Sequence, residues 1–178
     1  GYLTIKSYDP LTCSYTLGIP NAEVARGFSK SLVRRAAGAQ VGEFNGLVRT
    51  ISRSLRAHDM EGALRATKAF MAGMPYHLGS HSERGFQTTF WLIFTLLGAQ
   101  IETEVKTATG RVDAVVKTPD AIYVVEFKYE KSAQEALAQI GERGYLLPYA
   151  ADGRKLYKVG VNFSEKTQTI GEWIIEEG

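Results

Sequence analysis

The segment AIYVVEFK, residues 121–128, begins with five apolar residues, most of them β-branched or aromatic, and then carries charges at Glu126 and Lys128. A second short run of this kind occupies residues 111–117. The two runs are separated by TPD, residues 118–120, in which proline presets φ and aspartate can hydrogen-bond its own backbone. This pattern predicts a tight antiparallel β-hairpin.

A turn centred on the proline–aspartate bond would place Asp113 directly opposite Glu126. Directly opposed residues lie roughly 4.5 to 5.5 Å apart at Cβ, so two carboxylates there repel each other. A divalent cation would reverse this penalty, because hard cations bind carboxylate oxygens. Lys128 shares a strand face with Glu126 through the period of two. The hairpin alone leaves a second interpretation open, in which Glu126 pairs with Lys128 or Arg111 at a solvated edge.

Residues 82–97 are expected to form a helix that packs inside the domain. Ser82 is a suitable N-cap, and apolar residues recur after it at helical spacing. Glu83 lies on the same stripe, three residues before Phe86, so a carboxylate begins a surface that faces the core. Glu83 is therefore a candidate third acid for the cation. Taken alone, it would be read as a charge that complements the helix dipole.

The order helix, strand, strand with Asp, strand with Glu-x-Lys, helix resembles the PD-(D/E)XK nuclease superfamily. The positions that match its motif are Glu83, Asp113, Glu126 and Lys128. The next helix adds Gln139, and Tyr145 follows it, similar to the glutamine and tyrosine that many members carry. Val112 stands where the family name has proline, a variation that leaves the acid in place.

Several segments look more narrowly like the bacterial branch that is joined to an AAA-ATPase-like region. They are GRVD at residues 110–113, EFK at 126–128 and ALAQI at 136–140. The opening GYLTIK, residues 1–6, and LGIPN, residues 17–21, look like the junction in such proteins. The resemblance implies two partners, namely nucleic acid, with DNA expected, and an upstream ATPase-like region of the same full-length protein.

The resemblance also implies a fold and a metal. The fold is α/β, a restriction-endonuclease-like mixed sheet with an αβββαβ core flanked by helices and preceded by a small, mainly helical lobe. The metal is Mg²⁺ or Mn²⁺, held by Asp113, Glu126 and the carbonyl of Phe127. Glu83 would bind it through water or through a second ion.

The implied activity is metal-dependent hydrolysis of phosphodiester bonds. Lys128 would orient the attacking water, and Gln139 and Tyr145 would position the backbone or the lysine. A non-cleaving interaction module that keeps the same fold and is coupled to an ATPase is the alternative. A small-molecule hydrolase on this scaffold has no support in the sequence.

The chain divides near residue 80 into an N-terminal part, 1–80, and a nuclease-like part, 81–178. The first part is expected to hold a hairpin, 2–8 with 14–19, and helices at about 21–35, 43–57 and 59–74. The second part is expected to hold strands at 99–106, 111–117, 121–128, 155–163 and 169–176, and a helix at 132–143.

Composition fits a protein with one principal domain. The chain has 178 residues, a formal charge of +2 and a pI near 8.6, which is too mild an excess to indicate nucleic-acid binding by itself. The single Cys13 excludes an internal disulfide and a multi-cysteine zinc site. We expect a cytoplasmic protein without a membrane partner, since neither a signal peptide nor a spanning segment is recognisable.

Two further groups of residues attract attention. Arg49, Arg53 and Arg56 form a basic stripe at helical spacing, for which a solvated helix face is favoured over phosphate contact. His77 and His81 are four residues apart, but the connector between them contains Gly79, and no third and fourth ligand is evident. A zinc site is therefore not expected.

Overall fold

The computed structural model describes residues 3–21, 23–24, 27, 31, 41–73, 90, 93 and 100–178. The predictions for Glu83, for the two histidines and for most of the helix at 82–97 lie outside these residues. Two positions of that helix, Phe90 and Ile93, are described, and both are helical and buried. They agree with a helix that packs inside the domain.

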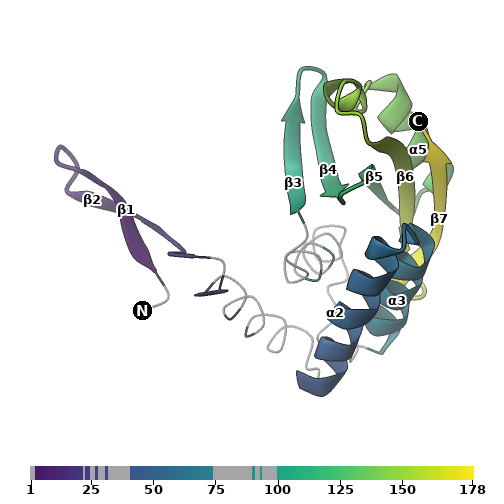
Figure 1. Cartoon of the computed structure of the whole chain (residues 1–178), viewed down its shortest axis with the longest axis horizontal. Coiled ribbons are helices and arrows are strands. Elements are labelled where there is room, and N and C mark those ends of the chain that lie inside the picture. The colour runs from purple at the N-terminus through teal and green to yellow at the C-terminus, as the bar shows by residue number, and fades with distance from the viewer. Residues whose placement is uncertain are drawn as a thin grey trace.

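A five-stranded mixed sheet forms the body of the protein (Figure 1). Its order is β3-β4-β5-β6-β7, and only β5 and β6 run parallel. The strands are β3 (Gln100–Thr107), β4 (Gly110–Lys117), β5 (Ala121–Tyr129), β6 (Lys155–Ser164) and β7 (Thr169–Glu177). The mixed α/β sheet and the positions of its strands confirm the sequence prediction.

Helix α5 (Ala133–Glu142) makes the crossover that the parallel β5–β6 pair requires. It begins with a capping box, in which the Ser132 side chain accepts from the Glu135 N–H while the Glu135 carboxylate accepts from the Ser132 N–H. A short 3₁₀ turn, η1 (Leu147–Tyr149), follows it and leads back to β6. This crossover carries Gln139.

The sheet is covered on both faces. Helices α2 (Val41–Arg56) and α3 (Met60–Ala72) lie side by side and pack on one face together with Phe90. Ile140 of α5 and Tyr145 pack on the other. β5 alternates between the two cores and is buried on both sides, as strands in such layers are. Among the described residues, no helix is long and apolar enough to cross a membrane.

Helix α2 packs against the sheet through an apolar stripe. Its buried residues Leu47, Ile51 and Leu55 are spaced by four and form one stripe. The predicted basic stripe, Arg49 with Arg53 and Arg56, is exposed on the same helix. Phosphate contact by these arginines stays open.

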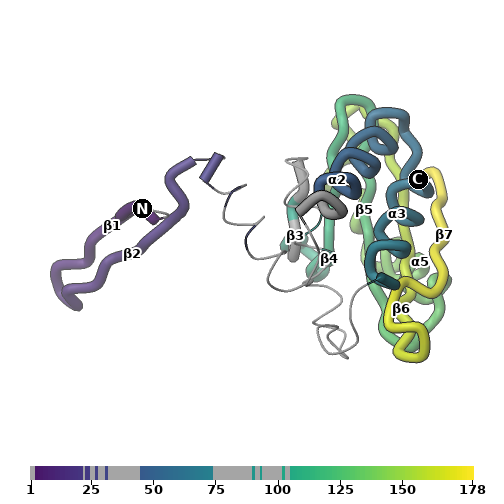
Figure 2. Tube along the Cα trace, turned by 90° about the horizontal axis from the view of Figure 1, so that it is seen from below, coloured from purple at the N-terminus to yellow at the C-terminus, as the bar shows by residue number. Residues whose placement is uncertain are grey.

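Strands β1 (Thr4–Asp9) and β2 (Ser14–Gly18) form a separate two-stranded hairpin, which Figures 1 and 2 show apart from the large sheet. Ile5 pairs with Leu17, and Tyr8 pairs with Tyr15. The register shifts between Ile5 and Ser7, so one extra residue is accommodated and both apolar pairs lie on one face. The large apolar side chains of this segment are all substantially exposed, namely Leu3, Ile5, Tyr8, Leu11, Tyr15, Leu17 and Ile19.

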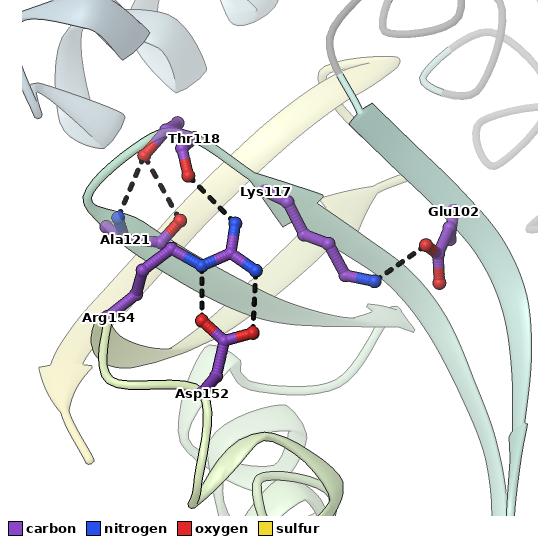
Figure 3. Close-up of polar contacts among 6 residues, drawn as sticks. All are labelled: Glu102, Lys117, Thr118, Ala121, Asp152 and Arg154. Atoms are coloured by element: carbon purple, nitrogen blue, oxygen red, sulfur yellow. Dashed lines mark hydrogen bonds and ion pairs between the residues drawn. The ribbon is translucent and has the colours of Figure 1, made fainter.

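The turn between β4 and β5 is tied down by a dense set of polar contacts (Figure 3). The Thr118 hydroxyl accepts from the Ala121 N–H at 3.1 Å, and the Arg154 guanidinium donates to the Thr118 carbonyl at 3.0 Å. Arg154 also makes a two-pronged ion pair with Asp152. Beside them, Lys117 pairs with Glu102 at 2.6 Å. Each charged group drawn in this figure therefore meets an opposite charge.

Candidate metal and catalytic site

The β4–β5 hairpin has the register that the turn chemistry predicted. Its pairs run from Lys117 with Ile122 to Ala114 with Val125, and the next position in that register sets Asp113 against Glu126. The backbone ladder ends at that point, and the Asp113 carboxylate instead accepts the Phe127 N–H at 2.9 Å. At the start of the candidate site, a hydrogen bond from the backbone to a side chain thus takes the place of the backbone–backbone hydrogen bonds between β4 and β5.

The regular pleat of β4 also changes at Asp113. Ala114 and Val116 pack in the core under α2 and α3, whereas Val112 and Val115 both pack on the side of α5. Positions 112 and 115 would lie on opposite faces of a regular strand. Asp113 is therefore in an irregular stretch, where its carboxylate can turn towards β5.

Glu126 is the most unusual ionisable group of the described structure. It is only 3% exposed, and its Oε1 accepts from the Gln139 amide and lies 3.4 Å from the Lys128 ammonium nitrogen. Its Oε2 is buried and has no hydrogen-bond partner within the described part of the chain. Burial first, and the Asp113 carboxylate second, raise the pKa of Glu126 to about 7, against a lowering by Lys128.

Lys128 and Gln139 are brought together from different elements. Lys128 lies two residues after Glu126 on β5, and its ammonium donates to Oε1 of Gln139 at 2.6 Å. The Gln139 NH₂ group donates to Glu126, so one amide bridges the cation and the carboxylate. This bridge fixes the orientation of the amide, because only its oxygen can accept and only its nitrogen can donate.

Tyr145 lies on the same side of the sheet but deeper. It is 2% exposed and packs with Val112, Val115 and Ile140. A Cβ atom at position 110 would lie 2.8 Å from the Tyr145 hydroxyl oxygen, so glycine there makes room for the ring. The structure shows Tyr145 as a core residue beside the start of β4, and its role in positioning the lysine stays a prediction.

The donor set fits a hard divalent cation. Two carboxylates converge, and one of their oxygens is buried without a partner among the described residues, which is costly unless a cation or a proton compensates it. Within the described residues, no three His, Cys, Asp or Glu side chains form a cluster that could hold a metal ion. Glu83, the predicted third acid, is outside those ranges. The alternative of a solvated Glu126–Lys128 pair does not fit, since Glu126 is buried.

One feature of the β3–β4 ladder was not predicted. Lys106 and Arg111 are directly opposed in the β3–β4 ladder, and both are exposed. The signal was present in the sequence, because a turn between residues 107 and 110 sets these two cations against each other.

The fold is thus a mixed α/β sheet that gathers Asp, Glu and Lys side chains where its β4–β5 hairpin opens. The family model described as the PD-(D/E)XK nuclease superfamily matches residues 81–173, and the chain belongs to this superfamily. The match includes every candidate site residue.

A curated relative is also similar to this chain. It is the "Uncharacterized protein in vnfD 5′ region" of Azotobacter chroococcum mcd 1, 28% identical over an alignment 191 positions long that covers 99% of this chain and 36% of the relative. The chain thus spans about a third of the length of that protein. No solved structure matches the chain significantly.

Proposed function

We propose that this chain is a nuclease that hydrolyses phosphodiester bonds of nucleic acid, with DNA as its substrate, and that it depends on Mg²⁺ or Mn²⁺. The observation that carries the proposal is the buried Glu126 carboxylate, which has the Asp113 carboxylate beside it and one oxygen that meets no partner in the described part of the chain. A protein that needed only stability would be served better by an apolar residue there.

In this proposal Asp113 and Glu126 hold the cation, with the Phe127 carbonyl as a further ligand and Glu83 as the third acid. When bound, a divalent cation activates water for attack and offsets the negative charge that grows on the phosphate. The Phe127 N–H donates to one Asp113 oxygen and so holds this carboxylate in place beside Glu126. Since Glu126 has a pKa of about 7, loading the site near neutral pH releases a proton.

Lys128 supplies a positive charge to the reacting phosphate and orients the attacking water. Gln139 holds it in place through the 2.6 Å hydrogen bond, and this preorganisation is useful because the ammonium need not be ordered during the reaction. Lys128 is partly exposed, so its ammonium group can reach a substrate. Gln139 is thus a positioning residue.

The direct test is incubation of plasmid and single-stranded DNA with the chain in Mg²⁺ or Mn²⁺. Asp113→Ala should abolish cleavage, whereas the matched control Asp120→Ala, in the exposed turn of the same hairpin, should keep it. Cleavage by Asp113→Ala at the unmodified rate would reject the assignment.

A second candidate is a non-cleaving interaction module that couples an ATPase-like region of the same polypeptide to a partner. It is favoured by the exposed apolar face of the β1–β2 hairpin. It also agrees with the narrower family branch proposed from the sequence. Calorimetry with Mn²⁺ separates the candidates, because binding that is lost in Glu126→Ala supports the nuclease. No binding near millimolar Mn²⁺ supports the module.

A further inference from the structure

Helix α5 lies directly on the backbone of β6 at one position. Gly160 is buried and is paired with Glu126 in the parallel β5–β6 ladder. A Cβ atom at Gly160 would lie 2.2 Å from the Ala133 carbonyl oxygen and 2.8 Å from the Leu137 backbone nitrogen. Contacts below 3.0 Å are essentially never seen for a Cβ atom. The helix can therefore lie where it does only because position 160 has no side chain.

Gly160 belongs to the face of the sheet that carries the candidate site. Its neighbours Val159 and Val161 pack in the core under α2 and α3, so position 160 is directed to the other face. Glu126 is on this other face as well, because the Gln139 amide of α5 reaches it. The close approach of helix and strand thus lies next to the candidate site.

One helix makes both the contact with Gly160 and the contact with the site. Leu137 contacts position 160, and Gln139 follows two residues later on α5. The buried face of the helix is narrow at this end, since its first two buried residues are Ala133 and Ala136. Alanines on the helix and glycine on the strand together let the two backbones approach closely.

Space, rather than backbone conformation, accounts for glycine at position 160. The positive-φ glycines of the described residues are Gly110, Gly144 and Gly153, and Gly160 is not among them. A glycine inside a strand weakens it, because it costs more conformational entropy and provides no side chain to pack. The close approach of α5 is the feature that this residue makes possible.

A methyl group at position 160 would have to move the helix, because the two atoms nearest to it are backbone atoms. Restoring ordinary van der Waals contact with the Ala133 oxygen would displace α5 by about 1 Å. The Gln139 oxygen accepts from the Lys128 ammonium at 2.6 Å. An increase of about 1 Å would take this distance beyond the range of a hydrogen bond.

We infer that Gly160 is a positioning residue of the candidate site. Its missing side chain lets α5 lie close enough to β6 for the Gln139 amide to bridge the carboxylate and the ammonium of the site. The effect on cleavage rests on the proposed nuclease function, whereas the placement of the amide does not. The site thus depends on a residue that has no functional group of its own.

The test combines NMR spectroscopy with single-turnover cleavage at saturating Mn²⁺. Gly160→Ala should move the side-chain NH₂ signals of Gln139 to the values of a solvated amide and lower the cleavage rate per folded molecule about 100-fold. Gly62→Ala is the matched control, because its Cβ would lie 2.0 Å from the Asp59 carboxylate on α3, away from the site. It should lower stability and leave both readouts unchanged.

A double-mutant cycle separates positioning from a general loss of stability. In a Gln139→Ala background the amide is absent, so adding Gly160→Ala should change the cleavage rate per folded molecule by less than about twofold. The fall in melting temperature caused by Gly160→Ala should remain in this background. An equal loss of cleavage with and without the Gln139 amide would overturn the inference, because Gly160 would not act through Gln139.

Gln139→Asn tests the same placement with the packing intact. It withdraws the amide by one methylene group, and it should lower the cleavage rate about as much as Gly160→Ala does. Cleavage by Gln139→Asn at the unmodified rate would overturn the inference, also where Gly160→Ala does not fold. Unchanged Gln139 signals in folded Gly160→Ala would overturn it and leave the nuclease proposal standing. Absence of cleavage by the unmodified chain would overturn the nuclease proposal, while the NMR signals still decide whether Gly160 places the amide.

Discussion

The two ends of the β4–β5 hairpin are built in opposite ways. At the turn end, Lys117 and Arg154 each meet a carboxylate, and Arg154 also satisfies the Thr118 carbonyl. At the other end Glu126 is buried beside a second carboxylate, and one of its oxygens has no partner among the residues that the structure describes. The same two strands thus carry a region optimised for stability and a region where stability is given up.

This difference indicates that one end of the hairpin serves catalysis and the other end serves the stability of the fold. Ion pairs stabilise the conformation of the turn. Two neighbouring carboxylates, one of them buried, repel each other, and such a pair is kept only where function requires it or where the surrounding fold compensates the cost. Substitutions at the turn end should therefore act on folding, and those at the site end on catalysis. Four experiments test this division, beginning with the largest expected effect.

Lys128→Met should lower the rate of DNA cleavage by about 1,000-fold, equivalent to about 4 kcal/mol of transition-state stabilisation. The reason is loss of the one cation that Gln139 holds beside Glu126. Single-turnover cleavage at saturating Mn²⁺ measures it, with Lys131→Met in the exposed loop after β5 as control. A loss below tenfold would mean that Lys128 does not act on the reacting phosphate.

Glu126→Gln should remove a pH dependence of stability. The pKa of the Glu126 carboxyl is near 4.5 in the unfolded chain and about 7 in the folded protein. The free energy of unfolding should therefore fall as pH rises from 4.5 to 7 and stay at the lower value above pH 7. At about 1.4 kcal/mol per pH unit, the loss is on the order of 3 kcal/mol.

Urea unfolding of the metal-free protein at pH 5 and pH 8 measures this loss. The difference between the two pH values should be smaller in Glu126→Gln, and saturating Mn²⁺ should restore much of the stability of the unmodified chain at pH 8. Glu142→Gln, at the exposed end of α5, serves as control. Equal pH profiles for the Glu126 variant and the unmodified chain would show that this carboxyl is not perturbed.

Arg154→Ala should lower the free energy of unfolding by less than the Glu126 carboxyl does, since it removes charge-assisted hydrogen bonds to Asp152 and Thr118 at the protein surface. The cleavage rate per folded molecule should remain within twofold. Equilibrium urea unfolding and cleavage well below the transition midpoint measure the two effects. A change in cleavage larger than the change in folded fraction would contradict the division between the two ends.

The Lys117–Glu102 pair should contribute the least, about 0.5 kcal/mol, because Glu102 is half exposed. A double-mutant cycle with Lys117→Met and Glu102→Gln isolates this coupling from the contact of Lys117 with the Tyr149 ring. A coupling above 2 kcal/mol would show that the turn end is as strongly interdependent as the site end.

Local signals in the sequence were sufficient for much of the fold. The register of β4 and β5 followed from the TPD turn, and Gln139 was placed near Lys128 by family resemblance, with the contact now seen. The hairpin β1–β2 and helices α2 and α3 were also found where expected. These features depend on neighbours close in the chain.

Other features could not be read from the chain because distant segments create them. Glu126 is buried and accepts a hydrogen bond from Gln139 of α5, and the contact of Arg154 with the Thr118 carbonyl joins residues 36 positions apart. The change of pleat at Asp113 has no local signature. In the first hairpin, the odd spacing of Ile5 and Tyr8 predicts opposite faces, and only the register shift brings them together.

That first hairpin also carries a convenient chemical handle. Cys13 is the sole cysteine of the chain, and it is exposed in the turn between β1 and β2. A maleimide dye would therefore attach at one known position without any mutation. Because the apolar face lies on the strands that this turn joins, the dye's emission and tumbling would report when another surface covers them.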